Sequence, residues 1–170
     1  MTVVMAVLYA VTFLLVASVL PMASFDTESG KLRVVPDVLF AMAAVCGAVD
    51  ENRKRAGIMA LVTGFLTDVF IMPPTHLSPL LFAACAYYIP LLFGRFTHKN
   101  ALSAAVSAMP FFLARAVCGG LFLRSEYGFL PFGAVFSRVL LPEFLLTALA
   151  AAVLYYPVKG LYTYCARRLD

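Results

Sequence analysis

The chain of 170 residues is 63% hydrophobic and only 13% charged, and its mean hydropathy is +0.93. Soluble domains carry about 25% charged residues, so this composition indicates a membrane protein. A bilayer core of about 30 Å needs roughly 20 helical residues per crossing, so six crossings would use about 120 residues. This leaves no room for a soluble catalytic domain, and the long apolar runs exclude the alternating pattern of a β-barrel.

Six apolar segments follow one another along the chain, and we expect each of them to form a membrane-spanning helix. Their approximate ranges are 2–20, 36–49, 56–72, 77–94, 101–123 and 133–158. The first segment is longer than a signal-peptide core and follows no Lys or Arg, so we expect it to be retained. The sequence therefore predicts an all-α membrane protein, with residues 1–170 forming a single transmembrane domain of about six helices.

The second segment is the shortest, with about 14 residues that would extend roughly 21 Å as a helix. That length is also typical of a re-entrant helix or of a helix buried inside the protein. Five spans therefore stay open as an alternative to six.

The basic residues predict the orientation of a six-span bundle. Eight of them fall on the side of the two termini, namely Arg53, Lys54, Arg55, Arg95, Lys99, Lys159, Arg167 and Arg168. The opposite side holds four, namely Lys31, Arg33, Arg124 and Arg138. By the positive-inside rule both termini lie in the cytoplasm. These short basic clusters between apolar segments suit a membrane topology, so we expect no nucleic-acid partner.

Three charged residues lie well inside the expected spans, where an ionisable group is unfavourable unless it faces protein or water. Counting along the helices places Asp68, Arg115 and Glu143 at similar depths. We expect Arg115 to pair with Asp68 or Glu143. This cluster is either a polar pocket or an ion pair that fixes how the helices dock.

Asp37 follows Pro36 at the start of the second segment, where a carboxylate favours the positive end of a helix. Capping accounts for this residue. The chain holds no Gly-rich phosphate loop, no Gly-x-Ser-x-Gly elbow and no His-Glu-x-x-His pair. The four cysteines also lack metal spacing. We therefore expect no enzymatic activity, no cofactor and no metal site.

The Pro36-Asp37 pair, followed about 30 residues later by Gly64 to Asp68, resembles the bacterial rod shape-determining protein MreD family. The family pattern in this region is similar to Gly-Phe-x-x-Gly-Leu-x-x-Asp, followed by Leu-Gly after a short loop. Here Ala60 and Ser78 stand at two of the glycine positions. We expect motif and helix-packing roles for Pro36, Asp37, Ala60, Gly64, Phe65 and Asp68.

The resemblance implies a non-enzymatic scaffold of the cell-elongation machinery in the bacterial cytoplasmic (inner) membrane. It implies binding to the single-span membrane protein MreC and, with it, to the peptidoglycan synthase complex. The family is also similar in fold to the substrate-binding S components of energy-coupling-factor vitamin transporters, which gives an alternative function. An intramembrane aspartyl enzyme that uses Asp37 and Asp68 is a third, weaker alternative.

Overall fold

The computed structural model describes residues 2–19, 25–26, 33–34, 37–50, 52–70, 77–98, 100–127, 133 and 136–169. The α-helices are α1 (Thr2–Val19), α2 (Val38–Val49), α3 (Arg53–Phe70), α4 (Ser78–Phe93), α5 (Ala101–Tyr127) and α7 (Leu141–Leu169). A π-helical turn, η1 (Phe136–Leu140), leads directly into α7. Two short strands, β1 (Phe25–Asp26) and β2 (Arg33–Val34), lie between α1 and α2 and pair with each other in antiparallel orientation.

Each apolar segment of the sequence overlaps one of these α-helices, although α3 begins earlier, at Arg53, and α5 continues to Tyr127. The sixth differs most from the expectation, because α7 continues to Leu169 instead of ending near Val158. The apolar run ends where Lys159 interrupts it, but a helix can continue through polar residues. The pairing of β1 with β2 was not expected from the polar stretch in which these strands lie.

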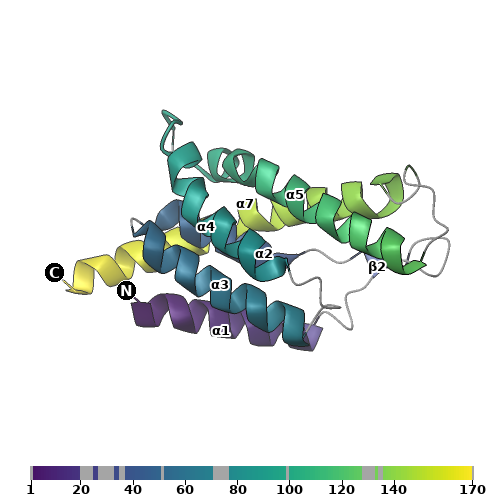
Figure 1. Cartoon of the computed structure of the whole chain (residues 1–170). Coiled ribbons are helices and arrows are strands. Elements are labelled where there is room, and N and C mark those ends of the chain that lie inside the picture. Colours follow the sequence, from purple (N-terminus) through teal and green to yellow (C-terminus); the bar gives the residue numbers. More distant parts are fainter. Residues whose placement is uncertain are drawn as a thin grey trace.

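The helices lie side by side along one long direction of the molecule (Figure 1). Both termini lie at one end, together with the turn between α2 and α3, and β2 lies toward the opposite end. Successive long helices therefore alternate in direction, as a membrane bundle with short connections requires.

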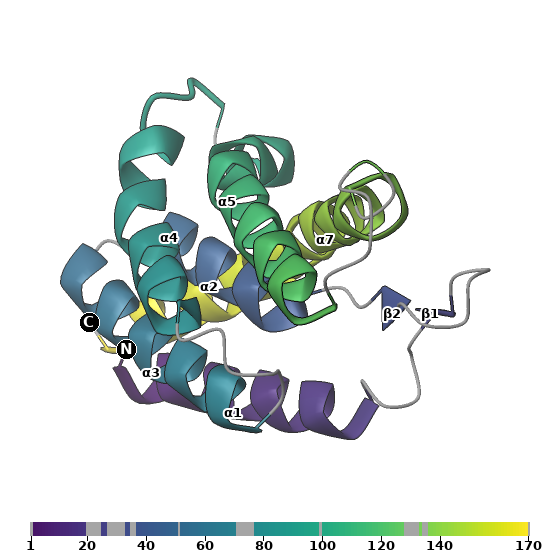
Figure 2. The ribbon, with the colours of Figure 1, turned by 45° about the vertical axis from the view of Figure 1, so that its right-hand side comes forward.

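The short helix α2 occupies the centre of the bundle. It contacts each of the other five α-helices, and all nine residues from Leu39 to Gly47 are buried. Figure 2 shows α2 enclosed between its neighbours. At 1.5 Å per residue its 12 residues extend about 18 Å, too little to cross a bilayer core of about 30 Å. The second apolar segment therefore forms a helix buried inside the protein.

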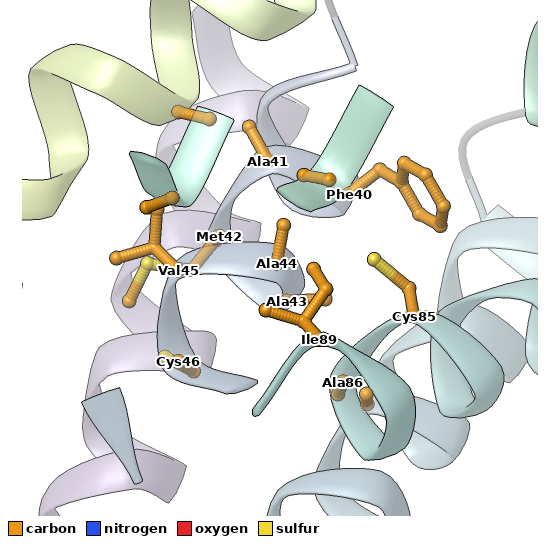
Figure 3. Close-up of a cluster of buried hydrophobic side chains, with 14 of the residues drawn as sticks. Phe40, Ala41, Met42, Ala43, Ala44, Val45, Cys46, Cys85, Ala86 and Ile89 are labelled. Atoms are coloured by element: carbon orange, nitrogen blue, oxygen red, sulfur yellow. The ribbon is translucent and has the colours of Figure 1, made fainter. Parts of the chain in front are cut away.

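The core around α2 combines small residues with a few large ones. Figure 3 shows Phe40 and Val45 of α2 among alanines of the same helix, with Cys85 and Ile89 of α4 beside them. The rings of Phe40 and Phe82 meet edge to face at 4.9 Å. Small side chains let helix backbones approach closely, which is the usual basis of helix association in lipid.

Glycine makes the closest of these approaches possible. A Cβ atom at Gly47 would lie 2.7 Å from the carbonyl oxygen of Ala86, and one at Gly64 would lie 2.8 Å from the Cα atom of Pro79. Because these neighbours are backbone atoms, they cannot move aside easily. Gly47 therefore sets the distance between α2 and α4, and Gly64 sets the distance between α3 and α4.

The outer surface is apolar. Large exposed side chains include Val7 and Leu14 on α1, Ile58, Leu61 and Phe65 on α3, Leu80 and Leu91 on α4, Leu102 and Leu113 on α5, and Leu149 and Val153 on α7. Two helical segments, Ala101–Gly119 and Leu141–Cys165, are long and apolar enough to cross a membrane. An outward apolar surface with buried polar residues suits a lipid surrounding.

Candidate functional site

Asp37 holds the start of α2 through three hydrogen bonds. Its Oδ1 atom accepts the N–H of Phe40 at 3.0 Å, which is the usual geometry of a helix N-cap. Its own N–H donates to Oγ1 of Thr147 on α7 at 3.1 Å. Its Oδ2 atom accepts Nε of Arg115 at 3.1 Å. Both carboxylate oxygens are therefore engaged, one within α2 and the other by α5.

Arg115 extends from α5 into the interior, where its side chain is only 8% exposed. Besides the ion pair with Asp37, its Nη1 atom donates to Oγ of Ser78, the first residue of α4, at 2.6 Å. Its guanidinium carbon also lies 5.9 Å from the ring centroid of Phe82, close enough for a cation–π contribution. One guanidinium thus binds the N-terminal ends of both α2 and α4.

We call Asp37, Ser78, Arg115 and Thr147 the Arg115 cluster. Its members come from α2, α4, α5 and α7, so it connects four of the six α-helices that the structure describes. A buried charge without partners would be strongly unfavourable, and the hydrogen bonds of the cluster compensate for removing the guanidinium and the carboxylate from water.

Glu143 lies beside the Arg115 cluster, one helical turn before Thr147. Pro142 precedes it, and a proline cannot donate a backbone hydrogen bond to the preceding turn. The π-helical turn η1 ends three residues before Glu143, and turns of this kind are frequent at functional sites. Glu143 lines a small cavity together with Asp37, Arg115 and Thr147.

Aromatic side chains, those of Phe40, Phe112 and Phe144, also line this cavity. The space open to the centre of a water molecule is about 10 Å³. A volume of that size holds about one water. The cavity is therefore far too small for a vitamin or another ligand of drug size, which needs several hundred Å³.

The motif of α3 has two different faces. Ala60, Gly64 and Asp68 are buried, and Gly64 meets Ser78 and Pro79 at the start of α4. This small-residue face therefore reaches the same end of α4 that Arg115 binds. Phe65 points the other way and is 59% exposed, so it does not take the helix-packing role within the chain that the sequence suggested.

A second aspartate, Asp50, lies at the C-terminal end of α2. Asp50 is the C-cap of α2. Its carboxylate accepts one hydrogen bond from Nε of Arg55 at 2.9 Å and another from the N–H of Asn52 at 3.0 Å. Burial by itself raises the pKa of Asp50, but the hydrogen bonds from Arg55 and Asn52 outweigh burial and hold that pKa below its ordinary value of 3.8. Asn52 in turn caps α3 by accepting the N–H of Arg55.

The structure places the expected charged residues differently from the sequence argument. The recorded ion pair of Arg115 is with Asp37, where we expected Asp68 or Glu143. Asp37 does not lie at the membrane surface, as a full span would place it, because α2 is short and begins inside the bundle. Glu143 shares the cavity of Arg115. Asp68 is buried on α3, one turn after Gly64.

Sequence reasoning did not identify Ser78 and Thr147 as members of the cluster. A usable signal was present, because Thr147 follows Glu143 by four residues and therefore shares its helix face. Pro36 lies outside the described residues. Within the described part of the chain, no group of three or more His, Cys, Asp or Glu side chains is arranged to hold a metal ion.

The comparison with protein families decides the identity of the chain. The model of the family described as rod shape-determining protein MreD matches residues 1–165. The chain belongs to the MreD family. No curated protein and no solved structure matches the chain, so the similarity to transporter S components remains without support.

Membership of the MreD family makes this chain a membrane component of rod-shape determination. The apolar outer surface and the two helices long enough to span a bilayer agree with that location. The Arg115 cluster then has a clear physical role in this MreD-family chain. It joins four helices by polar contacts in a region where water does not compete for the hydrogen bonds.

Proposed function

We propose that this MreD-family chain is a non-enzymatic scaffold of the bacterial cell-elongation machinery in the cytoplasmic (inner) membrane. It binds an MreC-like single-span membrane protein and, through it, the peptidoglycan synthase complex. The match of residues 1–165 to the MreD family carries this proposal. The buried polar groups support it as well, because Asp37 and Arg115 are engaged in holding helices together.

The proposed orientation is a bundle of the six expected helices with both termini in the cytoplasm, in which the short helix α2 is buried at the centre. The arrangement in Figure 1 supports it, because both termini and the α2–α3 turn lie at one end. Exposed cations near this end include Arg53, Lys54 and Arg95, as the positive-inside rule requires. An impermeant thiol reagent should therefore label Lys54→Cys only after the cells are opened. Labelling from outside intact cells would contradict the orientation.

We further propose that the partner helix binds the outward face of α3. Leu61 and Phe65 are 47% and 59% exposed, and they lie one helical turn apart within the segment that resembles the family motif. Their neighbours Ala60 and Gly64 face inward. Because Phe65 makes no use of the chain's own core, its side chain is free to contact another helix in the membrane.

Capture of a trimmed partner tests this function. The full chain is purified together with an MreC-like protein that keeps its membrane span and lacks its soluble domain. We expect stable capture by the unchanged chain, and about tenfold weaker capture by Phe65→Ala, because a large aromatic contact at an interface contributes more than 1 kcal/mol.

The matched control is Leu102→Ala on α5, where the side chain is 71% exposed and equally apolar. It should leave capture unchanged. Equal losses in both variants would remove α3 as the binding face, and loss of capture on trimming the partner would place the contact outside the membrane. Nanomolar vitamin binding by the isolated chain would contradict the scaffold function itself.

A further inference from the structure

An open hollow of about 440 Å³ lies at the start of α3, lined by Asn52, Arg53, Lys54 and Tyr87. Arg53 and Lys54 are exposed. Among the residues that the structure describes, neither of these cations has a recorded ion-pair partner. Two cations beside a hollow, with a tyrosine on its other side, form a surface that suits a phosphate group.

The neighbouring carboxylate does not cancel this positive charge. Asp50 is 1% exposed in its side chain and is occupied by Arg55, so that pair is neutral and turned inward. The acidic residue Glu51 lies outside the described residues. The N–H groups at the start of α3 add a further partial positive charge at the same place.

Apolar tracks lead away from the hollow along both helices. On α3, Ile58 and Leu61 lie four and seven residues after Lys54, on the same face, and both are exposed. On α4, the exposed residue Leu80 lies two turns before Tyr87 and shares its face. Tyr87 lies against α3 at Gly57, where an added Cβ would be in ordinary van der Waals contact with Tyr87 Cβ at 3.6 Å.

We propose that this hollow binds the phosphate headgroup of an anionic phospholipid. Arg53 and Lys54 contact the phosphate, and Tyr87 lies at the level of the headgroup. The acyl chains lie over the apolar tracks of α3 and α4. A lipid fits this surface better than a soluble phosphate does, because the cations continue directly into an exposed apolar surface. This inference goes beyond the scaffold function, and partner binding is not needed for it.

The absence of tryptophan from the chain allows a direct test. Tyr87→Trp places a single fluorescent reporter at the hollow, and Tyr156→Trp places one on α7, where the side chain is 66% exposed. Each variant is reconstituted as the full chain in phosphatidylcholine nanodiscs. Quenching is then measured with brominated phosphatidylglycerol and with brominated phosphatidylcholine, and the ratio of the two binding constants is the preference for the anionic lipid.

We expect a clear preference for phosphatidylglycerol at position 87. Removing both cations with Arg53→Gln and Lys54→Gln should reduce it at least fivefold, since a cation near the surface contributes about that factor. The matched control, Arg95→Gln with Lys159→Gln, removes the same charge from other exposed positions. It should leave the preference at position 87 unchanged, and the reporter at position 156 should not respond to the loss of Arg53 and Lys54.

Two results would overturn the proposal. Equal losses from the two double variants would show a diffuse attraction to net charge, with no site at the hollow. The second result is full protection of the position-87 reporter from quenching by brominated phosphatidylcholine when inorganic phosphate is added, at constant ionic strength and without anionic lipid. That result would show a site for soluble phosphate. Because all four substituted side chains are exposed, the variants should keep the elution profile of the unchanged chain.

Discussion

The two ends of α2 place similar chemical groups in very different surroundings. At the N-terminal end Asp37 binds Arg115, which lies 78 residues away on α5, and both side chains are almost fully buried. At the C-terminal end Asp50 binds Arg55, only five residues away, and the Arg55 side chain is 24% exposed. The first pair fixes how helices are arranged, whereas the second shapes a local turn.

These surroundings determine which pair matters more for the fold. Breaking a buried ion pair leaves a charge without water or partner and costs about 3 to 5 kcal/mol. In the second pair the guanidinium of Arg55 keeps access to water, and the buried carboxylate of Asp50 has a further hydrogen bond from the N–H of Asn52, so breaking this pair should cost less, about 1 to 3 kcal/mol. We therefore expect the N-terminal end of α2 to dominate stability.

Arg115→Leu should have the largest effect, a loss of about 3 to 5 kcal/mol in the free energy of unfolding, because Asp37 would stay buried without its cation. Unfolding in mixed micelles of increasing SDS content measures this loss. Arg55→Leu is the matched change at the other end and should cost less, about 1 to 3 kcal/mol, because Asp50 still accepts the N–H of Asn52. Similar losses for the two leucine variants would remove the distinction between the two ends.

Gly64→Ala should come next, with a loss of about 1 to 3 kcal/mol from overpacking, because its Cβ would lie 2.8 Å from Pro79 Cα near the Arg115 cluster. The same substitution at Gly57, also on α3, places its Cβ no closer than 3.6 Å to a neighbour. Gly57→Ala should therefore be neutral or slightly stabilising. Thermal unfolding in detergent compares the two, and a tolerated Gly64→Ala would argue against close contact of α3 with α4.

Thr147→Val removes the hydroxyl that accepts the Asp37 N–H and keeps the shape of the side chain. The buried donor would lose its partner, which costs about 1 to 2 kcal/mol. Thr163→Val, on the exposed part of the same helix, removes a hydroxyl that donates to the carbonyl oxygen of Lys159. That control should change stability by less than about 0.5 kcal/mol, and equal effects would mean that Thr147 does not hold α2.

The smallest effect concerns pH at the C-terminal end of α2. Because the folded pKa of Asp50 lies below 3.8, its ionised form stabilises the fold above that value. The contribution disappears as the pH falls through the lowered pKa. The stability difference between the unchanged chain and Asp50→Asn should thus be constant near neutral pH and shrink below pH 3.8. A difference that already shrinks above pH 5 would show a raised pKa instead.

The positions of the helices could be predicted from the sequence, because apolar runs of sufficient length permit little else in a membrane. The cap at Asp37 was also predictable, since capping depends only on residues within one turn. The end of α7 was not, because a helix that leaves the membrane continues without an apolar signal.

The partner of Arg115 could not be obtained by counting along each helix. Depth along a span is a local quantity, whereas the contact with Asp37 depends on α2 being short and central, which follows from packing against five other helices. Likewise, the outward direction of Phe65 depends on which face of α3 meets α4. Sequence patterns place residues on a face, and tertiary packing decides where that face points.

A double-mutant cycle on Arg115 and Asp37 tests the central claim most directly. Arg115→Leu, Asp37→Asn and the double variant are compared with the unchanged chain by unfolding in mixed micelles. Asp37→Asn keeps the oxygen that caps α2, so the cycle isolates the ion pair. We predict that the double variant is less destabilised than the sum of the single variants, by about 2 kcal/mol or more. Losses that add within about 0.5 kcal/mol would contradict a direct pair between α2 and α5.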